Sequence, residues 1–194
     1  MHQDIEEILI SEEELHNKIT ALGQRITQDY TDKNLLLLGT LKGAVPFIAD
    51  LARAINLPLE IDYMAVASYG NSTQSSGIVR ITKDLEGPID QKHILIIEDI
   101  IDSGLTLHYL IDLLNRRNPL SLKVCSLLNK DRERIKNVPV DYHGFTIPDK
   151  FVVGYGLDYA QLYRNLPYIG ILKPAIYSET ISPATQHKSK AEDE

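Results

Sequence analysis

Three carboxylates follow a hydrophobic run in the segment "IIEDIIDSGLT", residues 96–106. Glu98 and Asp99 come directly after the apolar residues, and Asp102 leads into a Ser-Gly step and a helix-like stretch. Acids at the end of a strand can hold hydroxyl groups or a divalent cation. The free N–H groups at the start of a helix attract phosphate. The segment therefore predicts a site for a ligand with phosphate and hydroxyl groups, although a helix cap would explain Asp102 taken alone.

The residues after Asp102 could surround one phosphate group. Ser103 and Thr106 offer hydroxyl donors, and Gly104 lets the backbone turn sharply so that its N–H groups face the same point. We therefore expect residues 102–106 to form an anion-binding loop.

The elements that must carry this segment read as strands and helices in alternation. The runs "NLLLLGT", "HILIIED" and "SLKVCSLLNK" are strand-like and hydrophobic almost throughout. Helical stretches lie between them, and "SEEELHNKITALGQRITQDY" begins with the capping-box spacing of Ser11 and Glu14. Such a pattern predicts an α/β fold with a mainly parallel sheet covered on both faces, and a ligand site at the carboxyl ends of the strands.

The remaining segments complete a single domain over residues 1–180. "LEIDYMAVASY", "IVRITKDL" and "KFVVGYG" are strand-like, and the polar stretch "GNSTQSSG" after the first of them is expected to be a mobile loop. Residues 181–194 are polar and are expected to form a frayed tail.

Composition excludes several classes of protein. The 194 residues carry a net charge of −7, which argues against a general nucleic-acid binder. Cys125 is the only cysteine, so neither an intramolecular disulfide nor a CxxC zinc site can form, and a reduced thiol suits a cytoplasmic protein. Neither a signal peptide nor a membrane-spanning segment is expected.

The segment "IIEDIIDSGLT" resembles the phosphoribosyl-diphosphate motif of type I phosphoribosyltransferases, in the form found in hypoxanthine-guanine phosphoribosyltransferases. Four further segments resemble that family in the same order. "LLLLGTLKGAVPF" is similar to its pyrophosphate loop, "VASYG" to its flexible catalytic loop, "LLNK" to its base-contacting segment, and "IPDKFVVGYGLDYAQLYRNLPYIGIL" to its purine hood and metal segment. The resemblance implies the type I phosphoribosyltransferase fold, with a small hood region beside the sheet.

The reaction that the resemblance implies joins hypoxanthine or guanine to 5-phosphoribosyl-1-diphosphate, with Mg²⁺, in purine salvage. Glu98 and Asp99 would hold the two ribose hydroxyls and a magnesium ion, and residues 102–106 the 5′-phosphate. Asp102 would be the acid/base group near the purine N7. The implied 5′-phosphate contacts are Asp102, Ser103, Gly104, Leu105 and Thr106.

Pyrophosphate and purine would meet other parts of the chain. Lys42, Gly43 and Arg164 would contact pyrophosphate, Asp158 would hold a magnesium ion, and the Leu41–Lys42 peptide bond is often cis in this family. For the purine, Lys130 would donate to O6, Phe151 would stack on the ring and the backbone of Val152 would meet its edge. The implied catalytic set is Asp102, Lys130, Ser68 and Tyr69, with the last two at the base of the flexible loop.

Alternatives from other classes stay open at this stage. A regulatory protein that senses the activated sugar and binds nucleic acid could share the fold, but the acidic charge argues against it. Neither GxGxxG at a strand-helix turn nor GxxxxGK[ST] occurs, which argues against a dinucleotide-binding oxidoreductase or a P-loop NTPase. A xanthine-preferring transferase is the nearest competitor. The resemblance also implies a homodimer or homotetramer, and Arg134 is matched to an arginine near the dimer interface.

Overall fold

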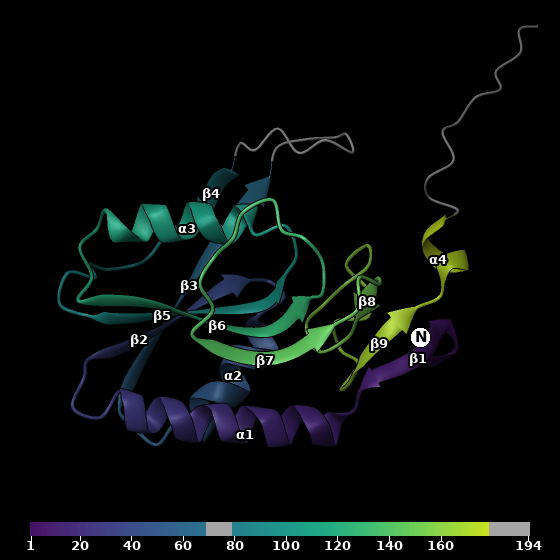
Figure 1. Cartoon of the computed structure of the whole chain (residues 1–194), viewed down its shortest axis with the longest axis horizontal. Helices are drawn as coiled ribbons and strands as arrows, with labels where there is room; N and C mark the ends of the chain where they lie inside the picture. Colours follow the sequence, from purple (N-terminus) through teal and green to yellow (C-terminus); the bar gives the residue numbers. More distant parts are fainter. Residues whose placement is uncertain (69–78, 179–194) are drawn as a thin grey trace, which may run out of the picture.

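Six strands form a central sheet with the order β4-β3-β2-β5-β6-β7 in a computed structural model that describes residues 1–68 and 79–178 (Figure 1). The strands are β2 (Leu35–Leu41), β3 (Leu59–Ser68), β4 (Val79–Lys83), β5 (His93–Ile101), β6 (Ser121–Lys130) and β7 (Tyr142–Ile147). All neighbouring pairs are parallel except β3–β4, which is antiparallel. The predicted mainly parallel sheet is confirmed, and its parallel strands share one carboxyl edge.

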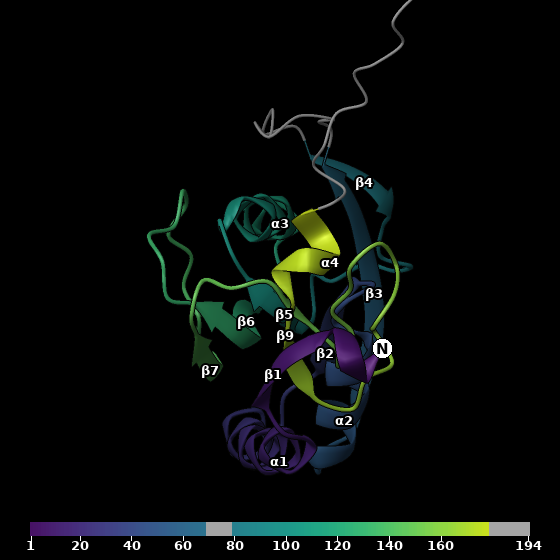
Figure 2. The ribbon, with the colours of Figure 1, turned by 90° about the vertical axis from the view of Figure 1, so that its right-hand side faces the viewer.

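Helices cover both faces of this sheet (Figures 1 and 2). α1 (Glu12–Asp29) and α2 (Val45–Ala54) pack on one face, while α3 (Leu105–Asn115) packs on the other. The chain leaves β2 toward α2 and the adjacent β5 toward α3, so the two connections diverge to opposite faces. Such a divergence opens a crevice at the carboxyl ends of the two strands, where ligands of open α/β sheets bind.

The predicted first helix is α1, and its start has the predicted capping box. The Ser11 backbone N–H donates to Glu14 Oε2 at 2.8 Å, and the Glu14 N–H donates to Ser11 Oγ at 3.3 Å. These contacts satisfy N–H groups that the first turn of a helix leaves without partners. The face toward the sheet buries the predicted apolar positions Leu15, Ile19, Leu22 and Ile26.

A second, small sheet stands beside the first and forms the hood. It comprises β1 (Ile5–Ile10), β9 (Ile169–Leu172) and β8 (Val152–Val153), all antiparallel in the order β1-β9-β8. The short helices η1 (His2–Asp4) and α4 (Pro174–Ser178) flank it. Only two residues of the expected strand "KFVVGYG" are in β8, because Gly154 and Gly156 turn the chain with φ of +98° each.

Some expectations concern segments outside the described residues. The loop "GNSTQSSG", Tyr69 and the tail over 181–194 all fall there. Among residues 1–68 and 79–178, none of the helices has the length and apolar character needed to cross a bilayer. Cys125 is a free thiol buried in β6, and this burial raises its pKa.

Candidate active site

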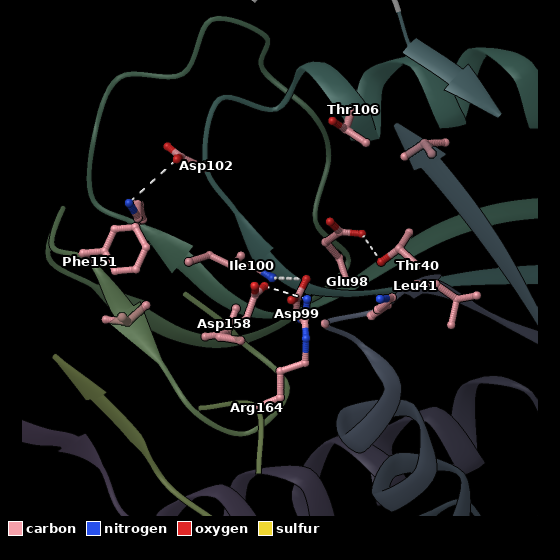
Figure 3. Close-up of a pocket in the computed structure, with 16 residues that line it drawn as sticks. Thr40, Leu41, Glu98, Asp99, Ile100, Asp102, Thr106, Phe151, Asp158 and Arg164 are labelled. Carbon is pink, nitrogen blue, oxygen red and sulfur yellow. Dashed lines mark hydrogen bonds and ion pairs between the residues drawn. The ribbon is translucent and has the colours of Figure 1, made fainter. Parts of the chain in front are cut away.

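A cleft of about 400 Å³ opens at the carboxyl edge of the central sheet, where β2, β5 and β6 end beside the hood (Figure 3). It brings together eleven of the residues singled out in the sequence: Lys42, Gly43, Glu98, Asp99, Asp102, Thr106, Lys130, Phe151, Val152, Asp158 and Arg164. They come from segments far apart in the chain. The cleft is therefore a product of the fold and not of one motif.

Two adjacent carboxyls lie at the base of the cleft. Thr40 Oγ1 donates to Glu98 Oε2 at 2.6 Å, and the Ile100 N–H donates to Asp99 Oδ1 at 3.0 Å. Burial is the main cause that raises the pKa of Glu98 to about 8 and that of Asp99 to about 6. A nearby carboxylate adds to each rise in pKa, Asp99 in the case of Glu98 and Asp158 in the case of Asp99. Glu98 and Asp99 can therefore release a proton when a cation binds beside them or when hydroxyl groups donate hydrogen bonds to them.

The end of β2 approaches this pair closely. The Leu41–Lys42 peptide bond is cis, as the resemblance implies. A Cβ atom on Gly43 would lie 1.6 Å from Asp99 Oδ2, so any side chain there would displace the Asp99 carboxylate. The Lys42 ammonium group is exposed and donates to Gln161 Oε1 at 3.2 Å.

The loop between β8 and β9 supplies the opposite wall. Arg164 Nη2 lies 2.7 Å from Asp158 Oδ1, and Arg164 Nη1 donates to the Gly156 carbonyl at 2.7 Å. Arg164 Nη2 also donates to Gln161 Oε1 at 3.3 Å, so one amide oxygen links Arg164 to Lys42. Lys42, just after β2, and Arg164, in the β8–β9 loop, are therefore two cations on one side of the cleft, as a polyanion requires.

The phosphate-binding loop predicted over 102–106 lies at the start of α3. Gly104 has φ of +78° as the helix N-cap, and a Cβ there would meet the Lys136 carbonyl oxygen at 2.2 Å. Ser103, Gly104 and Thr106 line a smaller cavity of about 130 Å³ next to the cleft, together with Glu98 and Asp102. Leu105 is the first residue of α3 and lines neither cavity.

Lys130 lies where β6 enters the cleft, between two carboxylates. Its Nζ is 3.1 Å from Asp149 Oδ1 and 3.7 Å from Asp102 Oδ2, and 14% of its side chain is exposed. The hydrogen bond from Lys130 holds the pKa of Asp149 below its usual value. Lys130 is thus a desolvated cation that a ligand can recruit.

Phe151 forms the apolar part of the same wall. The residue is 38% exposed and lines the cleft with Val152 and Ile100. Tyr177 of α4 stacks against Phe151 with ring centroids 5.1 Å apart, and Tyr159 meets its edge at 5.6 Å. A planar aromatic ligand would find a stacking surface here.

Ser68 is the last residue of β3, the strand that leads toward the cleft, and Tyr69 lies outside the described residues. The proposed roles of these two residues stay predictions.

The carboxylates of the cleft fit a magnesium ion. Among the described residues, no group of three or more His, Cys, Asp or Glu side chains could hold a metal by itself. Magnesium usually binds one or two carboxylates and takes its other ligands from water and substrate phosphates. The cleft offers carboxylates of this kind in Glu98, Asp99 and Asp158, which all line it.

Sequence reasoning missed Thr40, Gln161, Arg132 and Asp149, all of which contact the predicted site residues. Thr40 carried a usable signal, since it is a polar residue at the end of the apolar run "LLLLGT". The others lie in charged or polar loops, where the sequence pattern does not distinguish site residues from surface residues.

Comparison with known proteins decides the family. The model of the phosphoribosyl transferase domain family matches residues 6–160. The chain belongs to this family. The match includes Lys42, Glu98, Asp99, Asp102 and Lys130 and ends just after Asp158, so most of the cleft is phosphoribosyltransferase sequence.

Relatives of this phosphoribosyltransferase cover most of its length. A hypoxanthine-guanine phosphoribosyltransferase of Bacillus subtilis is 56% identical over 177 residues, or 91% of this chain and 98% of that protein. The crystal structure of a hypoxanthine phosphoribosyltransferase from Staphylococcus aureus superposes with a TM-score of 0.88 at 48% identity, covering 91% of this chain and 96% of that one. The bifunctional protein TilS/HprT of Listeria monocytogenes is 55% identical over 179 residues, but this chain spans only 28% of its length.

Proposed function

We propose that the protein transfers the 5-phosphoribosyl group from 5-phosphoribosyl-1-diphosphate to hypoxanthine and guanine, giving IMP or GMP and pyrophosphate. The observation that carries this proposal is one cleft that holds paired buried carboxyls, a helix N-terminus, two cations and the desolvated Lys130. The names of the Bacillus and Staphylococcus relatives support the choice of base. None of the relatives reported above supports the regulatory or the xanthine-preferring alternative.

The activated sugar occupies the middle of the cleft in this proposal. The 5′-phosphate binds the loop Asp102–Thr106, where the α3 N-terminus and the hydroxyls of Ser103 and Thr106 supply donors. Glu98 and Asp99 accept hydrogen bonds from the two ribose hydroxyls and so fix the ring. Their charge also favours the positive charge that develops on the sugar as the bond to pyrophosphate breaks.

Pyrophosphate leaves along the wall formed by β2 and the β8–β9 loop. Lys42 and Arg164 contact its oxygens, and the backbone of Gly43 lets it approach Asp99 closely. Glu98, Asp99 and Asp158 are the residues that would hold Mg²⁺. The ion, when bound, neutralises charge on the leaving group.

The purine lies on Phe151 with its six-membered ring toward β6. Lys130 donates to O6, Val152 meets the purine edge through its backbone, and Asp102 accepts or stabilises the proton at N7 while N9 attacks the anomeric carbon. Adenine carries a donor in place of O6 and would leave the ammonium group of Lys130 unpaired. The cleft therefore favours 6-oxopurines.

The wider setting belongs to the same proposal. Residues 1–180 form one catalytic domain, with 181–194 as a tail, and the protein acts as a homodimer or homotetramer in the cytoplasm. The single buried thiol of Cys125 is in keeping with a reducing compartment. Light scattering on the protein eluted from a size-exclusion column would give the number of subunits, and a monomer would contradict the proposed homodimer or homotetramer.

An initial-rate assay tests the proposed activity. The purified protein receives 5-phosphoribosyl-1-diphosphate and Mg²⁺ with hypoxanthine, guanine, xanthine or adenine, and nucleotide formation is followed. We expect turnover with hypoxanthine and guanine and none with adenine. Tight binding of the activated sugar without turnover of any base would overturn the enzymatic proposal and favour a sensor.

A further inference from the structure

Three neighbouring strands end with charged residues of alternating sign at the mouth of the cleft. Asp102 follows β5, Lys130 ends β6 with Arg132 just beyond it, and Asp149 follows β7. The strands run in parallel and in register, with Ile101 paired to Asn129 and Lys130 paired to Ile147. A carboxylate after β5 and another after β7 therefore face the two cations at the end of β6, the strand that lies between them.

Arg132 joins the two carboxylates through a single nitrogen. Arg132 Nη1 lies 3.1 Å from Asp102 Oδ1 and 3.3 Å from Asp149 Oδ2, while Lys130 binds the other oxygen of each carboxylate. A tight turn places it there, because the Arg132 N–H donates to the Lys130 carbonyl at 3.0 Å. Each carboxylate is thus shared by one lysine and one arginine.

The two cations differ in their access to the cleft. Lys130 lines both the cleft and a neighbouring cavity, whereas Arg132 lines the neighbouring cavity, together with Asn129 and Arg134, and is absent from the cleft wall. A purine in the cleft can therefore meet the ammonium group of Lys130 but not the guanidinium group of Arg132. Arg132 can keep its contacts to both carboxylates while the purine is bound.

We propose that Arg132 is a positioning residue, which keeps Asp102 at the purine edge by holding its carboxylate apart from Lys130. This inference rests on the proposed function, in which Lys130 turns to O6 and Asp102 to N7. Without Arg132, Asp102 and Asp149 would have only the ammonium group of Lys130 as their shared counter-charge. Lys130 and Asp102, which are 3.7 Å apart in the structure, would then draw closer to each other and be withheld from the base.

The substitution Arg132→Ala tests this role. We expect the KM for hypoxanthine to rise and kcat to fall, together lowering kcat/KM for the base about fivefold or more, since exposed ion pairs have modest strength and this one is a network. The KM for 5-phosphoribosyl-1-diphosphate should change far less, because the proposed donors to the 5′-phosphate are the α3 N-terminus and the hydroxyls of Ser103 and Thr106, whereas the contact of Arg132 in this loop is to the Asp102 carboxylate. Arg132→Lys should restore part of the loss, whereas Arg132→Gln should not.

Matched controls separate positioning from general damage. Arg25→Ala removes another exposed arginine, which lies 3.9 Å from Asp29 on α1 away from the cleft, and should leave both KM values and kcat unchanged. Arg132→Ala and Asp149→Asn together should cost less than the sum of their separate effects, since both act on one network. Equal melting temperatures of Arg132→Ala and wild type would show that the fold is intact.

The outcomes distinguish this inference from the proposed function. Wild-type turnover of hypoxanthine with unchanged base kinetics in Arg132→Ala would overturn the positioning role and leave the proposed function standing. Equal loss for the base and the activated sugar would also overturn it. A wild type that turns over no base would overturn both.

Discussion

Lys130 is the residue that most directly links this cleft to a 6-oxopurine. It is a largely buried ammonium group held by two carboxylates, so its charge is available only to a ligand that offers an acceptor inside the cleft. A carbonyl oxygen at the purine 6-position is such an acceptor. In the proposed function, the selectivity for the base therefore depends on one side chain at the end of β6.

Lys130→Met should therefore impair use of the base and spare the sugar. We expect kcat/KM for hypoxanthine to fall about 10- to 100-fold, because losing a hydrogen bond to a charged group weakens binding by about this factor. The dissociation constant of 5-phosphoribosyl-1-diphosphate, measured by calorimetry, should stay near that of the wild type. Lys92→Met is the matched control, since this lysine pairs with Glu60 at the opposite edge of the sheet. Equal weakening for base and sugar would contradict the O6 assignment.

Sequence reasoning found the residues that stand in recognisable segments and missed those that depend on strand order. Glu98, Asp99 and Asp102 follow one apolar strand and are visible as a cluster. Thr40 contacts Glu98 only because β2 and β5 are neighbours in the sheet, although β3 and β4 lie between them in the chain. Arg132 and Asp149 meet for the same kind of reason.

Glycine residues allow two turns at the cleft to approach neighbouring groups closely. The turn after β2 passes so near to Asp99 that a side chain at Gly43 cannot be accommodated without displacing that carboxylate. The loop before α3 likewise needs the left-handed conformation of Gly104. In the proposed function, both turns place backbone groups against the activated sugar.

Gly43→Ala should thus damage sugar binding more than the fold. We expect kcat/KM for 5-phosphoribosyl-1-diphosphate to fall on the order of 100-fold, because the displaced Asp99 would no longer meet the ribose. Gly87→Ala is the control, since a Cβ there meets no atom within 4 Å. Steady-state kinetics of both variants tests this prediction. Kinetics of Gly43→Ala equal to those of Gly87→Ala would contradict it.

The main elements were predictable because the residues that they bury are apolar and recur with the spacing of a strand or a helix. The apolar runs of β2, β5 and β6 and the periodic face of α1 each indicate one structure. β1 was not predictable in this way. Most of its residues are not buried, and it becomes a strand only by pairing with β9, which comes near the end of the described chain.

At the scale of the molecule, the two buried carboxyls of the cleft make the stability of the metal-free protein depend on pH. The raised pKa values of Glu98 and Asp99 mean that the folded protein holds protons which the unfolded chain releases. The usual values are 4.5 and 3.8, so the folded state binds more protons from about pH 4 up to about pH 8. The contribution of these two carboxyls to stability therefore decreases as the pH rises through this range.

Denaturant unfolding of the metal-free protein at several pH values measures this effect. The free energy of unfolding should fall between pH 5 and 8, with a contribution from Glu98 of up to about 1.4 kcal/mol per pH unit. Glu98→Gln cannot ionise at this position and should show a flatter profile. Glu86→Gln, at an exposed position, is the control and should keep the wild-type slope. Identical slopes in Glu98→Gln and wild type would contradict the account.

If this cleft performs phosphoribosyl transfer with Asp102 at the purine, loss of the Asp102 carboxylate must impair turnover and spare sugar binding. Wild type and Asp102→Asn are assayed for IMP and pyrophosphate formed from hypoxanthine and 5-phosphoribosyl-1-diphosphate with Mg²⁺, and the dissociation constant of the activated sugar is measured for both. We expect equimolar products from the wild type, and a kcat about 100- to 10,000-fold lower in the variant with nearly unchanged sugar binding. Near-normal turnover by Asp102→Asn would contradict the role of Asp102, and absence of product from the wild type would contradict the whole account.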